Sequence, residues 1–517
     1  MGHIFLYGPP ASGKSTVGRI LARNLNLPFV DLDDRTRQAA GMDIPQVMAE
    51  RGEAGFRELE STQFERLGML GMDSDSVVAL GGGTLLRNEN RARAESSGEI
   101  VCLNAGLNTL LQHLHDQPSS RPLLAGDLTE KLSALLTVRA AHYASFPTRL
   151  EVGRHTPEQL AWQIQATLGR FYLRGMGAGY EAVVQSGGID SLGALLQSHG
   201  LQNPIIVTDT NVAKLHADQT LDSLRRSHYE PKVLSVPAGE SAKTLDTITD
   251  LWRGFLEAGL DRKSTVVALG GGVVGDMAGF AAATFMRGVD WVVVPTTLLS
   301  MVDASLGGKT GFDLPEGKNL IGSFHSPRLV LADPQVLGTL PAVELRSGLA
   351  EVVKHGIIAD PGLFDLCAGG LEAVMNNLPQ IIRRAMAVKI KIIEEDPFEK
   401  GSRAALNLGH TVGHAVESAS GYSLRHGEAV SIGMVAEAKL AEYLKIAGKG
   451  LSSRIADTLS MLGLPTQIPK GLSKEKLIHA MQFDKKKAGG SVRFALPVRI
   501  GSVQVNVEVK DFQYFTK

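Results

Sequence analysis

Residues 3–25 read HIFLYGPPASGKSTVGRILARNL, and this stretch decides the fold of the first part of the chain. An apolar run of strand type (3–7) precedes the pattern G-x-x-x-x-G-K-S (8–15), and a helical stretch follows it. In this order, loop N–H groups and the helix N-terminus surround phosphate, the lysine reaches the terminal phosphates and the serine hydroxyl binds Mg²⁺. A loop that is only flexible would leave the Lys14-Ser15 pair unexplained. The residues expected to hold a nucleotide are Gly8, Ser12, Gly13, Lys14, Ser15 and Thr16.

Polar residues downstream of this loop describe a second ligand, which would accept the phosphoryl group. A predicted strand (28–34) delivers two carboxylates, one near Mg²⁺ and the other able to accept a hydroxyl proton. Three arginines suit a carboxylate, because guanidinium and carboxylate pair in a bidentate manner. A glycine triplet after another apolar strand implies close backbone approach to a ligand. The set fits a small polyhydroxy carboxylic acid, and a polar segment (113–120) before the second arginine could act as a lid. These residues are Asp31, Asp33, Arg57, Gly81, Gly82, Gly83, Arg121 and Arg139.

The segments GPPASGKST, DLDD, GEAGFR, GGGT, RPLL and RAAHY together resemble the shikimate kinase family. The resemblance implies a three-layer α/β/α domain that uses ATP and magnesium to phosphorylate shikimate. It also implies that Ser15 and Asp31 serve magnesium, and that Lys14 and the lid residue Arg121 act as catalytic cations at ATP. Gluconate kinase and adenylate kinase are competing families with the same loop, but GEAGFR and the glycine triplet argue against both. The residues that the resemblance assigns to shikimate are Asp33, Arg57, Gly81, Gly82, Gly83 and Arg139.

A second polar cluster lies in residues 399–428, EKGSRAALNLGHTVGHAVESASGYSLRHGE. Four polar residues follow one another at intervals of 4, 3 and 4, which places them on one face of a predicted helix. The helical pattern breaks at Gly421, and a third imidazole, His426, comes from the following segment. Two imidazoles at i and i+4 and a third from a loop can bind a divalent cation of zinc type. The four residues of the stripe are Arg403, Asn407, His410 and His414.

A fourth ligand for such a cation should be a carboxylate from another element. The pattern of residues 344–358 predicts a helix, with Glu351 and Lys354 on one face. Glu351 is therefore the expected carboxylate. His355, four residues after Glu351, is a rival ligand, but a fifth ligand would leave no room for substrate.

A dinucleotide site is suggested between these two clusters. Residues 264–283 predict a strand, a loop and a small-residue helix, and Gly270-x-Gly272-x-x-Gly275 matches the dinucleotide fingerprint. The match alone is weak, and Asp290, the acidic residue at the expected distance, runs directly into an apolar strand. Other polar partners are Asp209, Glu240 and Lys243. The stretch 294–327 adds polar residues at a density that no core needs: Thr296, Thr297, Asp303, Lys309, Lys318 and Asn319.

The motifs GGGVVGDMAGFAA, PTTLLSMVDASLGGKTG, GKNLIGSFHSP, GLAEVVKHG, NLGHTVGHA and LRHGEAV together resemble the 3-dehydroquinate synthase family from about residue 171 onward. The resemblance implies a Rossmann-like NAD-binding α/β domain and then a mostly helical metal-binding domain. The implied reaction converts a seven-carbon keto-acid phosphate (DAHP) to 3-dehydroquinate with loss of phosphate, through NAD⁺ and a metal, zinc or cobalt.

The resemblance assigns a role to each polar residue. The metal falls to Glu351, His410 and His426, and His414 becomes a proton-transfer group. NAD is expected around Asp209, Glu240, Lys243, Gly271, Gly272, Gly275, Asp276, Thr296, Thr297, Lys309 and Lys318. Substrate contacts are expected from Arg287, Lys309, Lys318, Asn319, Lys389, Glu399 and one lysine of 485–487. The other catalytic residues are Lys309, Asp303, Lys354, Arg403 and Asn407, and we expect Lys389 and Arg403 to hold the substrate carboxylate.

The chain as a whole thus resembles a fusion of two enzymes. We expect a kinase domain (1–165), a linker (166–175), an NAD-binding domain (176–335) and a helical domain (336–517). A related sugar-phosphate cyclase is a close rival for the second part. A polyol dehydrogenase is a weaker rival, because it would not need so many cations for a phosphate. A non-catalytic half is disfavoured, since the expected catalytic side chains occur in both halves.

The composition sets wider limits. A length of 517 residues suggests about three domains, and 44% hydrophobic residues suffice for packed cores. A net charge of −1 and the lack of a long apolar run give no sign of a nucleic-acid or membrane partner. The only two cysteines, Cys102 and Cys367, favour a reducing cytoplasm. Partners should be the small molecules shikimate, DAHP and ATP, and the resemblance implies a homodimer through the C-terminal half, because Arg287 reaches a neighbouring subunit in that family.

Overall fold

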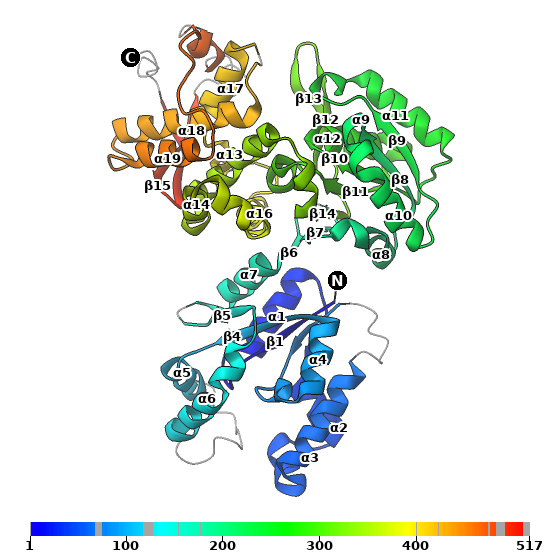
Figure 1. Cartoon of the computed structure of the whole chain (residues 1–517), viewed down its shortest axis with the longest axis vertical. Helices are drawn as coiled ribbons and strands as arrows, with labels where there is room; N and C mark the ends of the chain where they lie inside the picture. The colour runs from blue at the N-terminus through cyan, green and yellow to red at the C-terminus, as the bar shows by residue number, and fades with distance from the viewer. Residues whose placement is uncertain are drawn as a thin grey trace. The chain divides into compact units, whose positions relative to one another are not determined.

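The computed structural model describes residues 2–67, 75–116, 128–153, 155–175, 177–399, 401–421, 423–473, 476–481 and 492–509. Arg121 and the lysines 485–487 lie outside these ranges, so the structure says nothing of their predicted roles. The chain divides into two compact units, Met1–Thr167 and Leu168–Lys517, which we describe separately (Figure 1). Within the described ranges, none of the helices combines the length and the apolar character that crossing a membrane requires.

Unit 1 is built on a sheet of five parallel strands in the order β2-β3-β1-β4-β5. The strands are β1 (His3–Tyr7), β2 (Phe29–Asp31), β3 (Val77–Ala79), β4 (Gly98–Asn104) and β5 (Arg149–Glu151). The helices are α1 (Lys14–Leu25), α2 (Leu32–Ala40), α3 (Ile44–Arg66), α4 (Asn88–Ser97), α5 (Leu107–Asp116), α6 (Leu128–Ala144) and α7 (Pro157–Leu168). The central strands are almost wholly buried, as parallel strands covered on both faces are, which confirms the predicted α/β class.

The strand order explains where the site of unit 1 forms. Since β1, β2 and β3 are parallel neighbours, the loops after their carboxyl ends meet at one edge of the sheet. Those loops are the phosphate-binding pattern (8–15), the turn from β2 into α2, and the glycine triplet (81–83). Three segments far apart in the sequence therefore come together at one edge.

Unit 2 begins with a seven-stranded sheet in the order β6-β7-β14-β11-β10-β8-β9. All neighbouring strands are parallel except β6 and β7, which are antiparallel. The strands are β6 (Arg170–Leu173), β7 (Tyr180–Val184), β8 (Gln202–Asp209), β9 (Lys232–Val236), β10 (Ser264–Gly270), β11 (Asp290–Pro295) and β14 (Leu329–Ala332), and a separate hairpin consists of β12 (Lys309–Leu314) and β13 (Gly317–Phe324). The helices are α8 (Leu192–Ser198), α9 (Thr210–Val212), α10 (Asp218–Arg226), α11 (Leu245–Glu257) and α12 (Gly272–Thr284). The stretch 166–175, where we expected a linker, carries the end of α7 and strand β6 of this sheet.

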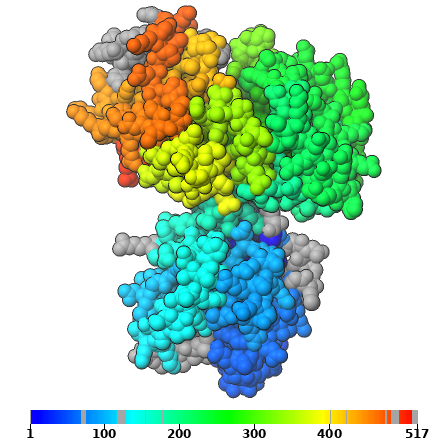
Figure 2. Space-filling model, viewed as in Figure 1, coloured from blue at the N-terminus to red at the C-terminus, as the bar shows by residue number. Residues whose placement is uncertain are grey.

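The rest of unit 2 is mostly helical, and it packs beside the sheet-containing part (Figures 1 and 2). Its elements are α13 (Ala342–Ala359), α14 (Pro361–Ala368), α15 (Gly370–Asn376), α16 (Leu378–Glu395), α17 (His410–Ala419), α18 (His426–Tyr443), α19 (Leu451–Met461), β15 (Arg493–Arg499) and β16 (Ser502–Glu508). A core of buried apolar residues joins α17, α18 and the β15–β16 hairpin; it includes Val416, Ile432 and Phe494. The mostly helical character expected of this C-terminal part is confirmed.

The single helix predicted across residues 403–414 is wrong. The structure has a 3₁₀ helix (Ser402–Asn407), a break, and then α17, which starts at His410. Gly409 causes the break, because its φ of 79° is a left-handed conformation that a helix cannot contain. His426 is also not a loop residue but the first residue of α18.

Candidate active sites

The phosphate-binding loop of unit 1 has the backbone that its sequence predicts. Gly8 has φ of 136°, and a Cβ there would lie 2.3 Å from the carbonyl oxygen of Leu103. Gly13, also left-handed with φ of 84°, caps the N-terminus of α1. The Lys14 ammonium folds back over the loop and donates to the carbonyls of Gly8 (2.9 Å) and Pro9 (2.8 Å). The Lys14 ammonium therefore bonds to the loop's own carbonyls, and a bound phosphate could replace them as acceptors.

A cavity of about 790 Å³ next to this loop gathers the predicted residues of unit 1. Gly8 and the buried Ser12 belong to the loop itself. Asp31 caps α2 by accepting a hydrogen bond of 3.1 Å from the backbone N–H of Asp33, so both carboxylates face the cavity from one turn. The predicted residues that line the cavity are Gly13, Lys14, Ser15, Thr16, Asp31, Asp33, Arg57, Gly81, Gly82, Gly83 and Arg139.

The glycine triplet is needed because charged side chains pack against its backbone. A Cβ on Gly81 would lie 2.4 Å from Oε1 of Glu60, and one on Gly83 would lie 2.7 Å from Nη2 of Arg57. Arg57 donates to Glu60 at 2.9 Å, and the Thr84 hydroxyl donates to the same carboxylate at 2.8 Å. The sequence interpretation missed Glu60. Its signal was the spacing of three residues from Arg57 on one helix, which allows a side-chain pair.

The carbonyl of Gly82 is the second anchor of the triplet. It accepts hydrogen bonds from Arg139 (2.9 Å), from the Tyr143 hydroxyl (2.9 Å) and from the Tyr7 hydroxyl (3.2 Å). Burial raises the pKa of Tyr143, so this phenol remains a donor at neutral pH. The Arg139 guanidinium is thus held at the triplet.

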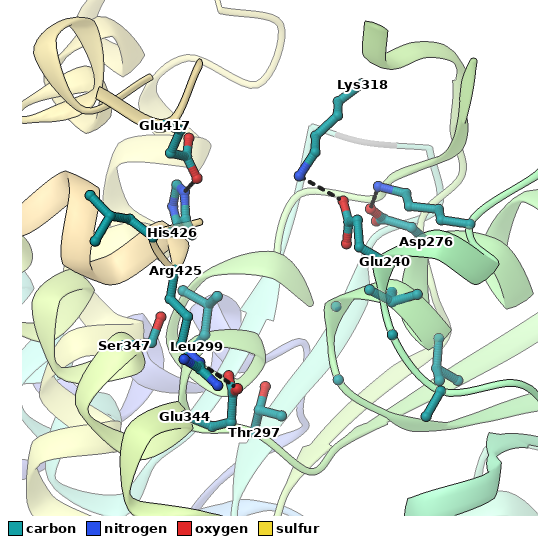
Figure 3. A pocket seen from close by; sticks show the side chains of 18 of the residues that line it. Glu240, Asp276, Thr297, Leu299, Lys318, Glu344, Ser347, Glu417, Arg425 and His426 are labelled. Carbon is teal, nitrogen blue, oxygen red and sulfur yellow. Dashed lines mark hydrogen bonds and ion pairs between the residues drawn. The ribbon is translucent and has the colours of Figure 1, made fainter. Parts of the chain in front are cut away.

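Unit 2 contains a cavity of about 1640 Å³ lined from both its sheet-containing and its helical parts (Figure 3). Glu240, Asp276 and Lys318 approach from one side, and Glu417 and His426 from the other. A small neighbouring cavity of about 10 Å³ is lined by Gly275 and Lys309 among others. The predicted residues on the wall of the large cavity are Asp209, Glu240, Lys243, Gly271, Gly272, Asp276, Thr296, Thr297, Lys318, Asn319, His414 and His426.

The sheet side of this cavity has the shape of a dinucleotide site. Strand β10 ends at Gly270 and α12 begins at Gly272, and the first residues of this helix line the cavity. A Cβ on Gly275 would meet no described atom within 4 Å, so the backbone here borders open space. These glycines leave room for a ligand with phosphate groups to approach the backbone.

A buried lysine links the glycine loop to the β12–β13 hairpin. Lys243 Nζ donates to Asp276 at 2.7 Å and to the Asn319 side-chain oxygen at 2.6 Å. Burial raises the pKa of Asp276 to about 6, although Lys243 acts in the opposite direction. Next to the turn of the hairpin, Lys318 Nζ lies 3.4 Å from Oε1 of Glu240. The polar residues that the sequence placed near NAD and near substrate are therefore in direct contact.

Three predicted metal ligands meet on the helical side of the cavity, and one of them, His426, lines its wall. Glu351 is fully buried on α13, and its Oε1 lies 3.3 Å from Nε2 of His426 and 3.6 Å from Nε2 of His410. One ligand atom from each residue lies within 4.8 Å of the others. Burial and Lys354 lower the pKa of His410 to about 3, so its imidazole is neutral and able to bind a metal at neutral pH. Burial raises the pKa of Glu351, but Lys354 and the two histidines outweigh it and hold this pKa well below its usual range.

His414 lies beside this group and remains accessible. It is exposed on α17, one turn after His410, with their ring centroids 5.3 Å apart. Its ring centroid is 6.3 Å from that of His426. The sequence interpretation missed Glu417, whose Oε1 lies 3.5 Å from Nδ1 of His426. Its signal was a spacing of three residues from His414, on the same helical face.

Cations and carboxylates are paired in the buried region behind the metal ligands. Lys389 donates to the Asp303 carboxylate at 2.6 Å and to the Asp303 carbonyl at 2.7 Å, and Lys354 forms an ion pair with Glu351. Burial lowers the pKa of Lys389 and Asp303 opposes this. His355 is fully buried here, and neither of its ring nitrogens has a hydrogen-bond partner among the described residues. Ligand atoms of His355, Asp303 and Glu351 also lie within 4.8 Å of one another. The positive charges of Lys354 and Lys389 nearby make this a poor place for a cation.

Three further predicted residues meet at the end of α16. Glu399 forms ion pairs with Lys309 and with Arg403, whose Nε lies 3.1 Å away.

Asn407 is exposed at the end of the 3₁₀ helix. Arg287 is exposed on the turn after α12, and it is not one of the described residues that line either cavity of unit 2. The structure of one chain therefore does not bring Arg287 to the site.

Taken together, the two units define a bifunctional chain, with a P-loop kinase site followed by a Rossmann-like site beside a histidine and carboxylate cluster. Comparison with protein families matches residues 10–169 to shikimate kinase, residues 233–347 to 3-dehydroquinate synthase N-terminal, and residues 348–487 to 3-dehydroquinate synthase C-terminal. The chain belongs to the 3-dehydroquinate synthase family and carries a shikimate kinase domain in front of it.

Relatives support this assignment. The 3-dehydroquinate synthase of Rippkaea orientalis is 45% identical over 338 residues, which are 64% of this chain and 92% of that protein. The enzyme of Symbiobacterium thermophilum is 45% identical over 337 residues, 64% of this chain and 94% of that protein. Among solved structures, 2-epi-5-epi-valiolone synthase from Streptomyces hygroscopicus, with NAD⁺ and Zn²⁺ bound, has a TM-score of 0.59 and 30% identity, covering 65% of this chain and 94% of that one. A complex of 2-deoxy-scyllo-inosose synthase with carbaglucose-6-phosphate, NAD⁺ and Co²⁺ has a TM-score of 0.61 and 25% identity, covering 66% and 96%.

Proposed function

We propose that unit 2 converts DAHP to 3-dehydroquinate with release of phosphate, and that unit 1 phosphorylates shikimate with ATP. The observation that carries the first part is the convergence of Glu351, His410 and His426, because His426 lines the same cavity as the glycine loop before α12. An enzyme that oxidises and later reduces one substrate needs a hydride acceptor and an electrophile in a single pocket. The 3-dehydroquinate synthase relatives, at 45% identity, support this substrate over those of the more distant cyclases.

The residues present fit zinc or cobalt together with NAD. Two imidazoles and a buried carboxylate around one point are the donor set of a catalytic zinc site with an open position. The two structural relatives that bind NAD⁺ hold Zn²⁺ or Co²⁺ with it, which supports the same pair for this chain. When bound, the metal supplies a Lewis acid for a substrate hydroxyl and NAD⁺ supplies the hydride acceptor.

The side chains of unit 2 suit an anionic substrate. His414 is exposed to the cavity beside the metal ligands, where its imidazole can accept or return a proton. Lys309 and Arg403 share Glu399 as a partner, and an incoming phosphate or carboxylate could replace that glutamate. Lys389 is held by Asp303 and supplies buried positive charge on the same side.

Unit 1 divides its residues between nucleotide and acceptor. We infer that Lys14 holds the terminal phosphates of ATP and that Ser15 and Asp31 hold magnesium. Asp33 then faces the acceptor hydroxyl, and Arg57 and Arg139 face its carboxylate. The position of Arg57 supports this division, because its guanidinium packs against Gly83, where a Cβ would lie 2.7 Å from Nη2.

We further infer a homodimer through unit 2 and a reducing compartment. Leu320, Ile321 and Phe324 of β13 are exposed apolar side chains, close to the exposed Phe398, and such a group is typical of a protein contact. Exposed Arg287 would then reach a partner's site rather than its own. Both cysteines, Cys102 and Cys367, are free and buried, as in a chain that does not depend on disulfides.

Two assays on the purified full chain test the proposal. One follows phosphate release from DAHP with NAD⁺ and Zn²⁺ present, and the other follows ADP formation with shikimate and ATP. We expect both activities, and we expect Lys14→Ala to abolish only ADP formation. Normal shikimate phosphorylation by Lys14→Ala would overturn the role of the loop. Phosphate release from a sugar phosphate but not from DAHP would instead identify unit 2 as one of the related cyclases.

A further inference from the structure

Glu417 lies against His426, a metal-ligand candidate whose two ring nitrogens each lie near a carboxylate. The Nε2 atom of His426 is 3.3 Å from Oε1 of Glu351, and its Nδ1 atom is 3.5 Å from Oε1 of Glu417. The Glu417 side chain is only 13% exposed. Figure 3 shows Glu417 pointing at His426 from the neighbouring helix.

The position of Glu417 follows from helix geometry. It lies seven residues after His410 and three after His414 on α17, and residues at these spacings share one face. That face looks toward the start of α18, whose first residue is His426. One face of α17 therefore supplies a metal ligand, a proton-transfer group and a carboxylate.

The chemistry of imidazole gives this carboxylate a specific task. A neutral imidazole has one N–H donor and one nitrogen with a lone pair, so binding a cation through Nε2 requires the proton on Nδ1. A carboxylate beside Nδ1 stabilises that tautomer, because it accepts the N–H bond. The other tautomer would turn the Nδ1 lone pair of His426 toward the negative charge of Glu417, which is repulsive.

We propose that Glu417 is a positioning residue, which fixes the tautomer and ring orientation of His426 so that Nε2 binds the metal. This inference rests on the proposed metal site of unit 2. It goes beyond that site because it assigns a residue that holds a ligand rather than the metal itself.

An alternative is that Glu417 binds a second cation. Ligand atoms of His414, Glu417 and His426 also lie within 4.8 Å of one another. However, His426 would have to offer Nδ1 to this cation while Nε2 binds the first one, which requires a fully deprotonated ring. A single metal with an oriented ligand is therefore the favoured arrangement.

The test measures metal binding by the full chain without nucleotide. Zn²⁺ affinity is determined by competition with a chelator, and the visible spectrum of the Co²⁺-loaded protein reports the ligand geometry. We expect Glu417→Ala to weaken Zn²⁺ binding by roughly 10- to 100-fold and to alter the Co²⁺ spectrum. Glu417→Gln should show a smaller loss, because its amide oxygen can still accept the Nδ1–H bond.

Two comparisons make the result decisive. Glu372→Gln, on the exposed surface of α15, is the matched control and should retain both affinity and spectrum. The thermal midpoint of metal-free Glu417→Ala should equal that of the wild type, which separates ligand orientation from folding. Unchanged affinity and spectrum in Glu417→Ala would overturn this inference alone, as would a second Zn²⁺ per chain that is lost in that variant. Absence of Zn²⁺ binding in the wild type, or normal binding in His410→Ala, would overturn the proposed metal site itself.

Discussion

The Glu437 carboxylate accepts a hydrogen bond of 2.5 Å from the backbone N–H of Gly409. Its other oxygen accepts from the N–H of Val412 at 3.2 Å. A fully buried acid of α18 thus caps the first turn of α17, which begins with His410. The two helices that carry His410 and His426 are joined through this carboxylate.

This contact predicts a pH dependence of stability. Burial raises the pKa of Glu437 to about 8, although the backbone N–H groups oppose the shift. Because the folded state then holds the proton more tightly than the unfolded state, the stabilising contribution is complete below the unfolded pKa and is lost as the pH rises toward 8. We expect the free energy of unfolding of the wild type to fall relative to Glu437→Gln by a few kcal/mol between pH 5 and pH 8. Urea unfolding of both proteins across this range measures the difference, and parallel pH profiles would contradict it.

Close packing of α17 on α18 predicts that Gly433 tolerates no side chain. A Cβ there would lie 1.9 Å from the carbonyl oxygen of Gly409. Gly433→Ala must push the helices apart, so we expect a loss of about 2–4 kcal/mol in stability and weaker Zn²⁺ binding. Gly448→Ala is the matched control, since a Cβ at Gly448 meets no described atom within 4 Å. Equal thermal midpoints for the two variants would refute the packing argument.

The ion pair of Lys389 and Asp303 predicts that the effects of substituting the two residues on stability are not additive. Lys389→Met leaves the partly buried Asp303 carboxylate without its 2.6 Å partner and should cost at most about 3–5 kcal/mol. Adding Asp303→Asn removes the uncompensated charge, so the double variant should recover part of this loss. Chemical unfolding of the four proteins measures the coupling. Strictly additive losses would mean that the two side chains do not stabilise each other.

The glycine triplet of unit 1 predicts a selective defect in acceptor binding. A Cβ on Gly83 would lie 2.7 Å from Nη2 of Arg57, so Gly83→Ala must displace that guanidinium. We expect the KM for shikimate to rise by roughly tenfold or more, with the KM for ATP nearly unchanged. Gly106→Ala, where a Cβ meets no atom of the described chain within 4 Å, is the control. A rise of both KM values together would point to a general folding defect instead.

Sequence reasoning placed the two sites well where a motif has a mechanism tied to its spacing. The loop at residues 8–15 lies between a strand and a helix as expected, and it meets the glycine triplet because parallel strands share one edge. The proximity of Glu351 to His410 and His426 was also predictable, because a divalent cation accounts for three closely spaced histidines and calls for a carboxylate from another helix.

Tertiary contacts account for what the sequence did not reveal. Intervals of 4, 3 and 4 suit one helix, but Gly409 takes a left-handed conformation where it packs against Gly433. Glu437 reads as an ordinary surface charge of a helix, because only the docking of α17 buries it. Glu417 and Glu60 left a signal in their helical spacing, which the interpretation did not use.

The most direct test of the metal-dependent synthase is phosphate release from DAHP by purified His410→Ala, with ADP formation from shikimate measured in the same preparation. We predict that phosphate release falls by roughly a thousandfold or more, because the electrophile is lost, while shikimate phosphorylation stays at the wild-type rate. Retention of phosphate release in this variant would contradict the assignment of Glu351, His410 and His426 as the metal site.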